Sequence, residues 1–465
     1  MKSISLGSSL SLAISVLAVK CRAQCQSNAE VITRDVAIIG GGATGTYAAI
    51  NLKDSGKTIV MVERKSYLGG HTATYHDPST GTPINYGLQT YWDNSYAREF
   101  FSRLNITVAK GTFPASKTPM YIDFTDGKTL TNYTIPTIND DYIAELHKYP
   151  YLENGLELPD PVPEDLLLTW ADYMTKFNIT DDAFSVYSRP AVAGDLTKTL
   201  ALYVFNNLNT VMLEEQLDGQ TISNADGDFA EPYRNALAEL GTDVLLNSTV
   251  SSGTRGNTTS EGVKLCVSTP EGDKQIVAKQ LVFAAPPVLD NLQPFDLDSR
   301  EEAIFSKFAG GFYYTGVVSS LGLPTNQSYV NRGQTTNSHV ASLPGNVMFN
   351  PTKVEGTYYY WYTSLQAMTQ DQVESATRDT LKLLQKSVGG SNTEAEPEFV
   401  AYNSHTPLHP TADADAIRAG VYRDYYAVQG YRNTWYTGSL LVTGSPQLWN
   451  ITSQLLPQII TASEQ

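Results

Sequence analysis

Positive charge is scarce in this sequence of 465 residues, which has 32 Lys and Arg against 48 Asp and Glu and a formal net charge of -16. Such a chain repels the phosphates of a nucleic acid, so we exclude a nucleic acid as its partner. Histidine is scarce too, with 6 residues, and none of them has a spacing typical of metal ligands. His405 and His409 are close in sequence, but Pro407 between them argues against a shared helical face. We therefore predict no metal site.

Long apolar runs are absent beyond the amino terminus. The stretch from Ile4 to Val19 is apolar, follows Lys2 and leads to a small residue at Ala23. It is interrupted by serines and is shorter than the roughly 20 apolar residues that cross a bilayer, so a cleaved secretory signal explains it better than an anchor. We expect residues 1–23 to be a signal peptide. The mature protein is then secreted or stays in the lumen of the secretory pathway, without contacting a membrane.

Cysteine is also rare, with 3 residues. Cleavage after Ala23 would remove Cys21 and leave Cys25 and Cys266, which form one disulfide or remain two free thiols; the sequence leaves both alternatives open. Asn-x-Ser/Thr sequons are frequent after the predicted signal peptide, and we interpret the set as glycosylation sites of a secreted protein. Their asparagines are Asn105, Asn132, Asn178, Asn247, Asn257, Asn326 and Asn450.

A strand, a tight turn, a helix and a second strand are predicted near the start of the mature chain. Asp35 to Ile39 is a short apolar run rich in β-branched residues, and a glycine cluster follows it. Thr46 to Leu52 is compatible with a helix, and Thr58 to Val62 is a second apolar run. Two strands joined in this way lie parallel in a sheet that helices cover on its faces. The sequence therefore predicts an α/β fold with a Rossmann-type domain.

The rest of the chain is predicted to alternate between this domain and a second one. Apolar residues three and four apart predict helices over 165–176, 196–217 and 371–386. A strand-and-turn region at 244–285 suits a return of the first domain, and aromatic runs between 312 and 365 suit the sheet of an α+β substrate domain. The predicted discontinuous Rossmann-type domain comprises 30–95, 225–290 and 400–465, and the interleaved substrate domain comprises 96–224 and 291–399.

The glycine cluster has the G-x-G-x-x-G spacing directly after a predicted strand. In such a turn glycine allows the tight bend, the close approach of a diphosphate and the packing of helix against strand, and the diphosphate lies on the amide groups at the helix start. Glu63 ends the second strand about 20 residues later, where a carboxylate binds ribose hydroxyls. The pattern predicts a bound dinucleotide held by Gly40, Gly42, Ala43, Thr44, Gly45 and Glu63.

The residues from Glu63 to His71 resemble the flavin-containing amine oxidase and phytoene desaturase superfamily. They read Glu-Arg-Lys-Ser-Tyr-Leu-Gly-Gly-His. In the superfamily an acidic residue is followed by a glycine pair that lies along FAD, usually with Arg where this chain has His71. The arrangement is most similar to the fungal beta-cyclopiazonate dehydrogenase group. This resemblance implies an FAD-binding domain of the Rossmann type, and it adds four residues to the FAD site: Arg64, Gly69, Gly70 and His71.

Three later segments extend the resemblance over most of the chain. Residues 85–89 are similar to a segment that passes near the isoalloxazine, Val250 matches a position that touches the adenine, and Ala285 matches a strand end beside the cofactor. Residues 433–449 are similar to the final flavin-binding segment, with Ser445 in place of the usual acidic residue. The resemblance thus implies further FAD contacts from Gly87, Leu88, Gln89, Val250, Ala285, Gly444, Ser445 and Leu448.

The same resemblance implies an oxidoreductase in which a hydride passes from an amine or an aromatic heterocyclic secondary metabolite to the flavin. The sequence has no second glycine fingerprint for a nicotinamide cofactor, and a secreted enzyme meets little NADPH, so we expect oxygen to be the electron acceptor. The alternative is a flavin-binding or carrier protein without catalysis, which the altered carboxyl-terminal segment leaves open.

Aromatic residues are the candidates for the catalytic face. Trp435 and Tyr436 lie in the final family-like segment, so we expect them near the flavin ring; core packing is the competing interpretation. Amine oxidases of the superfamily usually carry a lysine in the second domain, but residues 312–318 contain none and Lys307 lies upstream. Oxidation of a bulkier heterocycle or a desaturation therefore fits as well as amine oxidation. The candidates for a covalent link to the flavin are His71, His405 and His409.

Overall fold

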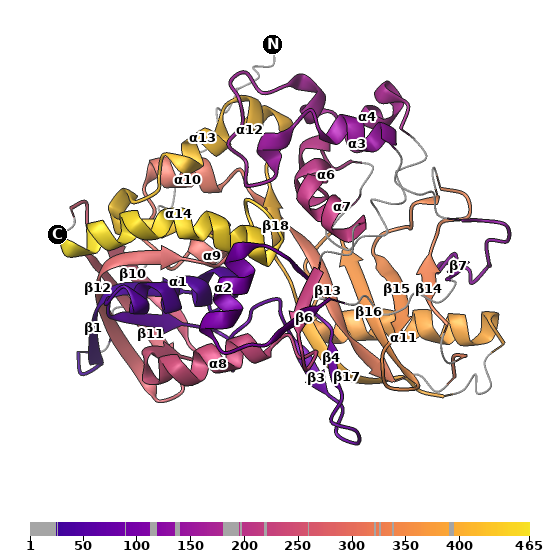
Figure 1. Cartoon of the computed structure of the whole chain (residues 1–465), viewed down its shortest axis with the longest axis horizontal. Helices are drawn as coiled ribbons and strands as arrows, with labels where there is room; N and C mark the ends of the chain where they lie inside the picture. The colour runs from indigo at the N-terminus through magenta and orange to yellow at the C-terminus, as the bar shows by residue number, and fades with distance from the viewer. Residues whose placement is uncertain are drawn as a thin grey trace, which may run out of the picture.

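The computed structural model contains two large sheets side by side, with a group of short helices above them in the view of Figure 1. It describes residues 25, 27–88, 90–111, 119–134, 140–179, 195, 198–217, 221–258, 260–319, 322–324, 327–336, 339–389 and 395–465. The predicted signal peptide at 1–23, the predicted FAD contact Gln89 and the sequon residue Asn326 lie outside the described residues. No helix in the described part of the chain combines the length and the apolar character needed to cross a membrane.

The first sheet is built around β1 (Glu30–Ile39), which lies between β12 (Gly272–Phe283) and β2 (Ile59–Val62) and runs parallel to both. Side chains alternate between its two faces, with Val36 and Ile38 in one core cluster and Ala37 in another. Because both faces are covered, the strand reads as a nearly continuous apolar run. The other strands of this sheet are β9 (Val244–Leu245), β10 (Thr249–Arg255), β11 (Val263–Thr269) and β19 (Thr434–Tyr436).

Two helices from opposite ends of the chain lie together on the first sheet. They are α1 (Ala43–Asp54), which follows the glycine turn, and α14 (Ser445–Glu464), which ends the chain (Figure 1). Trp449 of α14 stacks on Tyr47 of α1 at a centroid distance of 6.1 Å, and its indole Nε1 donates a hydrogen bond of 3.1 Å to the carbonyl oxygen of Ala43. The two helix starts are thereby fixed close to each other.

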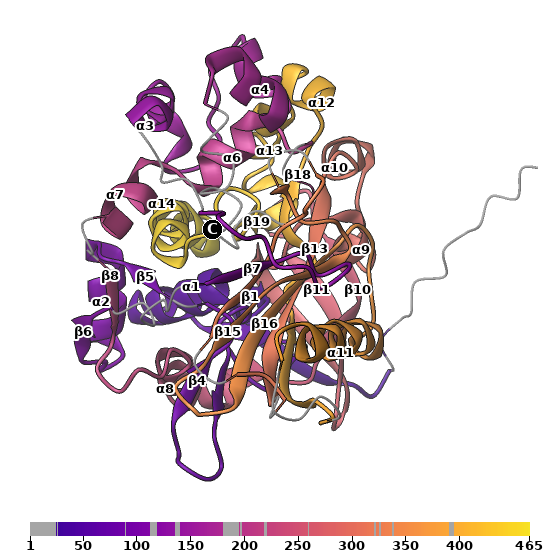
Figure 2. The same ribbon diagram turned by 90° about the vertical axis from the view of Figure 1, so that its right-hand side faces the viewer.

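The second sheet has the strand order β17 (Glu398–Ser404), β13 (Ala309–Ser319), β16 (Thr357–Ser364), β15 (Gly345–Pro351), β14 (Tyr329–Asn331) and β7 (Met120–Ile122), and β18 (Leu408–Thr411) also pairs with β13. Helix α11 (Gln370–Ser387) covers one face, as both views show (Figures 1 and 2). On β16, Tyr358, Tyr360 and Tyr362 belong to the core cluster under α11. Tyr359 and Trp361 belong to the cluster on the opposite face, as the strand period of two requires.

Shorter elements complete the fold. The small strands are β3 (Thr74–His76), β4 (Pro83–Asn85), β5 (Tyr91–Trp92), β6 (Val108–Lys110) and β8 (Thr221–Asn224). The remaining α-helices are α2 (Ser95–Arg103), α3 (Asp140–Leu146), α4 (Trp170–Phe177), α6 (Ala201–Asn207), α7 (Thr210–Leu217), α8 (Glu231–Leu240), α9 (Leu289–Leu292), α10 (Ser299–Phe305), α12 (Ala414–Arg418) and α13 (Val421–Tyr426). The 3-10 helices are η1 (Pro150–Leu152), η2 (Glu164–Leu167), η4 (Gly241–Asp243) and η6 (Tyr431–Asn433).

The α/β fold class and the Rossmann-type first domain are confirmed, and the details differ in three places. The predicted range 400–465 was assigned to the first domain, but β17 and β18 at its start pair in the second sheet. The helix predicted over 165–176 begins only at Trp170, after the short η2. The helix predicted over 196–217 is divided into α6 and α7, because Leu208 leaves helical geometry with ψ of 64°.

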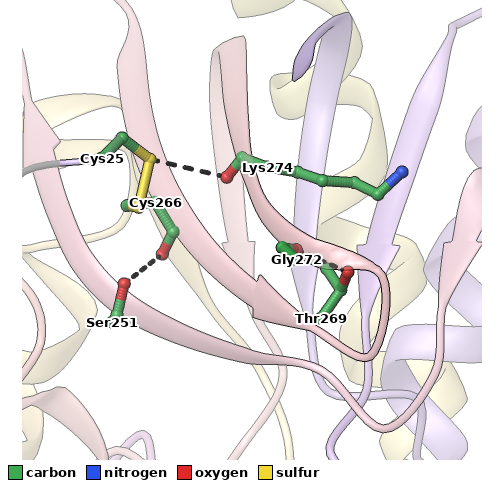
Figure 3. Close-up of a disulfide and its surroundings, with 6 residues drawn as sticks. All are labelled: Cys25, Ser251, Cys266, Thr269, Gly272 and Lys274. Atoms are coloured by element: carbon green, nitrogen blue, oxygen red, sulfur yellow. Dashed lines mark hydrogen bonds between the residues drawn. A yellow bond between two sulfur atoms is a disulfide. The ribbon is translucent and has the colours of Figure 1, made fainter. Parts of the chain in front are cut away.

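A disulfide joins the start of the described chain to the first sheet. Cys25 is bonded to Cys266 of β11, with Cα atoms 5.3 Å apart and a sequence separation of 241 (Figure 3). Next to it, the Ser251 hydroxyl donates a hydrogen bond of 3.2 Å to the carbonyl oxygen of Cys266. Of the two alternatives left by the sequence, the structure contains the disulfide, which fixes the segment leading into β1 against the β-hairpin at the edge of the sheet.

Most of the sequon asparagines lie at exposed turns. Asn105, Asn132, Asn178, Asn247 and Asn257 are exposed, and Asn450 is half-buried on α14. The first four have positive φ values of 59°, 63°, 56° and 50°. This left-handed conformation is uncommon for residues other than glycine, and Asn is enriched in it. The exposure agrees with the interpretation of these residues as glycosylation sites, which stays a prediction.

Candidate functional site

A cavity of about 370 Å³ lies between the first sheet and the edge of the second. Its walls come from the ends of β1, β2 and β12, from the starts of α1 and α14, and from the segment between β17 and β18. Most residues expected at the cofactor line it: Gly40, Gly42, Ala43, Thr44, Glu63, Arg64, Gly69, Gly70, His71, Leu88, Val250, Ala285, Ser445 and Leu448. The structure therefore brings together segments that are far apart in the sequence.

Three expected residues support the wall without lining it. A Cβ atom on Gly45 would lie 1.9 Å from the carbonyl oxygen of Gly40, and one on Gly87 would lie 2.0 Å from the carbonyl oxygen of His71. Gly444 directly precedes α14. At Gly45 and Gly87, glycine is required because two backbone segments touch. Their contribution to the site is the shape of the wall.

Two helices begin at the cavity with free backbone amides. Neither the residue before α1, Gly42, nor the residue before α14, Gly444, provides a side-chain cap. The first N–H groups of an α-helix have no partner inside the helix, and the helix dipole makes this end attractive to anions. Gly40 precedes α1 with φ of 100°, a left-handed conformation that glycine adopts without strain. The arrangement fits a diphosphate, as the glycine spacing predicts.

Glu63 fixes the shape of the glycine turn. Its buried carboxylate accepts a hydrogen bond of 2.6 Å from the backbone N–H of Gly41 and another of 2.8 Å from the backbone N–H of Lys65. Each carboxylate oxygen has two lone pairs, so one lone pair on each remains for a ligand hydroxyl in the cavity. This is the chemistry that a ribose requires.

A clamp of three residues connects the glycine pair to the second sheet. The Lys65 ammonium donates to the carbonyl oxygen of Gly70 at 2.9 Å and to Oδ1 of Asn403 on β17 at 2.6 Å. The amide Nδ2 of Asn403 donates to the same Gly70 oxygen at 3.3 Å. Burial lowers the pKa of Lys65 to about 8, against the opposing influence of Glu63. Lys65 lines the cavity and was not among the expected residues, although it directly follows the acidic strand end.

Two stacked histidines lie beside this clamp. The ring of His71 lines the cavity and stacks on His405 with centroids 4.2 Å apart and planes 13° apart. Burial lowers the pKa of His71 to about 3, with Lys65 and Arg64 adding to the effect, and burial also holds the pKa of His405 well below its ordinary value. His409, the third histidine considered for a covalent link, lies deeper, with Nδ1 3.0 Å from Nδ2 of Asn207. Of these three histidines, His71 faces the cavity directly.

The expected catalytic pair lies elsewhere, in the core of the first sheet. Strand β19 runs beside β12, so the indole Nε1 of Trp435 donates to Oε1 of Gln280 at 2.9 Å. The Tyr436 hydroxyl donates to Oε1 of Glu301 at 2.9 Å and accepts from Arg255 at 3.1 Å. Neither residue lines the cavity. The expectation that Trp435 and Tyr436 face the flavin is therefore wrong, because a parallel strand pairing turns both into structural core.

Aromatic residues of the second sheet lie on the same face as the clamp, although they do not line the cavity themselves. Trp361 of β16 lies opposite Thr315 of β13, which in turn lies opposite Asn403 of β17. Residues directly opposite in antiparallel strands project to the same face, so Trp361 shares the face of the clamp residue Asn403. On this face the Thr315 hydroxyl donates to the carbonyl oxygen of Tyr86. Lys307, at the end of α10, is exposed and does not line the cavity.

The carboxyl-terminal wall includes three residues that the sequence analysis did not single out. Gly438, Ser439 and Thr443 line the cavity in addition to Ser445. Gly438 has φ of 117°, and a Cβ atom there would lie 3.2 Å from the carbonyl oxygen of Ala284. Thr443 donates to Oδ1 of Asn207 at 3.0 Å. The signal for this wall was the Gly438-Ser439 pair directly after the apolar strand β19.

Sequence comparison gives relatives that match nearly the whole chain. A model of an NAD(P)-binding Rossmann-like domain matches residues 38–104. The FAD-dependent oxidoreductase dbaF of Emericella nidulans is 48% identical over 99% of this chain and 99% of its own length. The beta-cyclopiazonate dehydrogenase of Aspergillus oryzae is 31% identical over 93% of this chain and 94% of its own length.

Comparison with solved structures gives the same fold at low sequence identity. A CLA-producing fatty acid isomerase from P. acnes has a TM-score of 0.70 and 18% identity, covering 91% of this chain and 98% of its own. A putrescine oxidase solved with putrescine bound has a TM-score of 0.62 and 16% identity, covering 93% of this chain and 100% of its own. At this identity the likeness concerns the fold alone.

Proposed function

Because the chain belongs to the family of FAD-dependent oxidoreductases that includes beta-cyclopiazonate dehydrogenase, we propose that it oxidises an amine or an aromatic heterocyclic secondary metabolite with oxygen as the final electron acceptor. Family membership gives the reaction class and the cofactor: the protein is an oxidoreductase and uses FAD. The substrate class, the acceptor and the location in the secretory pathway are the parts that we propose.

The cavity fits FAD at several points. The starts of α1 and α14 present free amides for the diphosphate, and Glu63 offers acceptors for ribose hydroxyls. Val250 lies on the wall beyond Glu63, where an adenine would be held, and His71 lies toward the second sheet, where the flavin ring would be held. Bound FAD supplies an acceptor for a hydride and its electron pair. The protein supplies position, exclusion of water and proton handling.

The face of Trp361 carries the proposal for the substrate. Tyr359 and Trp361 stack with ring centroids 5.9 Å apart, and Tyr313 lies on the same face near His405. Aromatic rings bind flat heterocycles by stacking and bind cationic amines through the ring quadrupole. This face begins where the clamp holds the second sheet against the glycine pair. Tyr359 and Trp361 are buried and do not line the cavity, so a substrate in the cavity would meet this face at its edge, beside His71.

The disulfide supports the proposed location. A bond between Cys25 and Cys266 persists in an oxidising compartment and is rare in the cytosol. In such a compartment reduced nicotinamide cofactors are scarce, which favours oxygen as the acceptor. The exposed sequon asparagines are consistent with passage through the same compartment.

The decisive experiment is anaerobic bleaching of the flavin. The protein is expressed through the secretory pathway of a eukaryotic host, its visible spectrum is recorded, and amines and indole-type metabolites are added without oxygen. The proposal requires that at least one of them bleaches the flavin band, and that admission of air restores the band with release of peroxide. Small spectral shifts without bleaching by any compound would indicate a carrier, and bleaching without peroxide would overturn oxygen as the acceptor.

A further inference from the structure

The stacked histidines connect the cavity to the second sheet. His71 lines the cavity, and His405 lies directly behind it at a centroid distance of 4.2 Å. His405 is 6% exposed, and its sequence neighbours Ser404 and Thr406 line the cavity. The two rings come from segments 334 residues apart. They are brought together by the tertiary fold and not by a local sequence constraint. The pair stands where the FAD cavity meets the aromatic face.

Polar atoms next to this pair lack partners. Within the described residues, Nε2 of His405 and the hydroxyl of Tyr313 are buried and have no hydrogen-bond partner. The two rings lie 5.7 Å apart, and the backbone N–H of His405 donates to the carbonyl oxygen of Tyr313 at 2.9 Å. A buried polar atom without a partner is costly and rare in folded proteins. Both atoms lie in the layer directly behind the cavity-lining ring of His71.

The charges around the pair keep both rings neutral. Among the described residues, the groups that face it are Lys65 and Arg64, from the turn after β2, and the Tyr313 phenol, from β13. Burial is the main reason for the low pKa of each imidazole, and the two cations of the turn lower the pKa of His71 further. A neutral imidazole has one nitrogen that accepts a proton. At neutral pH both rings are therefore unprotonated, and either ring holds a proton only while a negative charge beside it raises its pKa.

The geometry points to His71 and His405 as a shared base that takes up the proton released when the substrate is oxidised, with His71 facing the cavity and Tyr313 positioning His405 behind it. The inference rests on the proposed function, because it assigns proton transfer within the same oxidation. The inference adds two roles that binding of FAD alone does not require, namely a base and a residue that positions it.

The step balances for an amine substrate. The C–H bond breaks, and its electron pair leaves with the hydrogen to the bound FAD. The N–H bond also breaks, its electron pair becomes the second bond of C=N, and the proton goes to a ring nitrogen of His71, which lines the cavity. The substrate is oxidised and the flavin is reduced. When oxygen reoxidises the flavin to give peroxide, the proton on the imidazole is available for peroxide or solvent.

Stacking restricts the pair to one proton. Two imidazolium rings at 4.2 Å would repel each other inside a buried site, so protonation of one ring disfavours protonation of the other. The neutral ring then lies flat against the charged one and stabilises it. The pair thus acts as a single titrating unit, which distinguishes it from two independent buried histidines.

The first test is the rate of anaerobic bleaching with the metabolite identified by the screen described above. His405→Asn and His71→Asn should each slow bleaching by roughly 10²–10⁴-fold, the range expected for loss of a general base. The remaining rate should rise with pH, because hydroxide replaces the base. Retained FAD, seen in the visible spectrum, shows that folding and cofactor binding persist. A wild-type rate in His405→Asn overturns the inference.

His409→Asn is the matched control. His409 is also buried, and its Nε2 also lacks a partner within the described part of the chain. Its ring packs edge-on against Tyr203, 5.8 Å away, and does not stack on a cavity-lining imidazole. Its replacement should leave the bleaching rate within about threefold of wild type. An equal loss in both variants would assign the effect to packing and overturn the inference.

A second readout needs no substrate and no turnover. The loaded protein is reduced anaerobically with dithionite, and proton uptake is followed with a pH indicator. If the pair takes the proton that accompanies reduction, His405→Asn should take up about one proton less per flavin than the wild type at neutral pH. Equal uptake overturns the inference while the proposed function stands. If dithionite reduces the flavin but no metabolite does, the proposed function is overturned. The difference in proton uptake still tests the histidine pair in that case.

Discussion

The two walls of the FAD cavity are built in different ways. The wall from the first sheet depends mainly on backbone, with Gly40 and Gly42 before α1 and free amides at two helix starts. The wall from the second sheet depends on side chains, with Asn403 in the clamp and His405 in the stack. A backbone wall requires that side chains be absent, whereas a side-chain wall requires particular ones. The first wall thus suits a cofactor common to a family, and the second suits an individual substrate.

The strongest way to break the first wall is to add one methyl group. Gly45→Ala would place a Cβ atom 1.9 Å from the carbonyl oxygen of Gly40, so the helix and the strand must separate. We expect FAD binding to weaken at least roughly 100-fold, about 2.8 kcal/mol, with a lower Tm. Titration of apoprotein with FAD measures this. Gly56→Asn is the control, since Gly56 has φ of 77° with open space around it and Asn tolerates that conformation; equal losses in both would contradict the account.

The second wall should respond in substrate kinetics and leave the cofactor in place. Trp361→Leu removes an aromatic ring from the face shared with Asn403, and we expect kcat/KM to fall on the order of 10–100-fold through KM, with FAD affinity unchanged. The matched control is Tyr360→Phe on the same strand. Tyr360 packs under α11, on the opposite face, and should alter neither value. Loss of FAD from Trp361→Leu would remove the distinction between the walls.

The clamp joins the two walls, so its removal should affect both by a smaller amount. Lys65→Met removes the hydrogen bonds to Gly70 and Asn403 and keeps an apolar chain of similar length. We expect FAD to bind about 10-fold more weakly, as for loss of about 1.4 kcal/mol, and kcat to decrease. Lys382→Met, which removes an exposed ion pair with Glu396, should have no measurable effect on either. Unchanged FAD affinity in Lys65→Met would show that the walls are held together by packing alone.

Buried histidines near the two walls also make the stability of the fold depend on pH. His71 and His409 have pKa values of about 3 and about 4 in the fold against 6.5 in an unfolded chain, because burial disfavours the charged rings. Between these values the unfolded chain binds more protons than the folded one, so the free energy of unfolding should rise as the pH rises and be lost as the pH falls below about 6.5, by up to about 1.4 kcal/mol per unit for each histidine. Urea unfolding at neutral pH and near pH 5 measures it. His409→Gln should reduce the slope; an unchanged slope would contradict burial as its cause.

The sequence predicted the backbone wall well because its constraints are local. The strand β1, the turn from Gly40 to Gly45 and the helix α1 are contiguous, and Glu63 follows within one βαβ unit. Hydrogen-bond geometry and glycine conformations dictate such a unit almost alone. The disulfide between Cys25 and Cys266 was one of two alternatives that the sequence left open, and only the structure decides between them.

The side-chain wall could not be predicted, because it depends on strand register across the whole chain. Lys65 and Asn403 are 338 residues apart, and nothing near either of them indicates the other. Trp435 shows a different error. It lies in a segment that resembles the family, but pairing of β19 with β12 turns its side chain toward Gln280 and away from the cavity. The boundary at residue 400 failed for the same reason, since strand pairing, not composition, assigns β17 to the second sheet.

The left-handed asparagines affect how carbohydrate at these turns would have to be studied. The usual exchange of a sequon asparagine for glutamine would force a longer side chain into a backbone conformation that glutamine adopts poorly, for example φ of 59° at Asn105. Such a variant would lose stability even without any attached sugar. Exchanging the exposed Thr107 for alanine abolishes the same sequon and leaves the turn intact. The hydroxyl position, two residues downstream, is thus the place where glycan and fold can be separated.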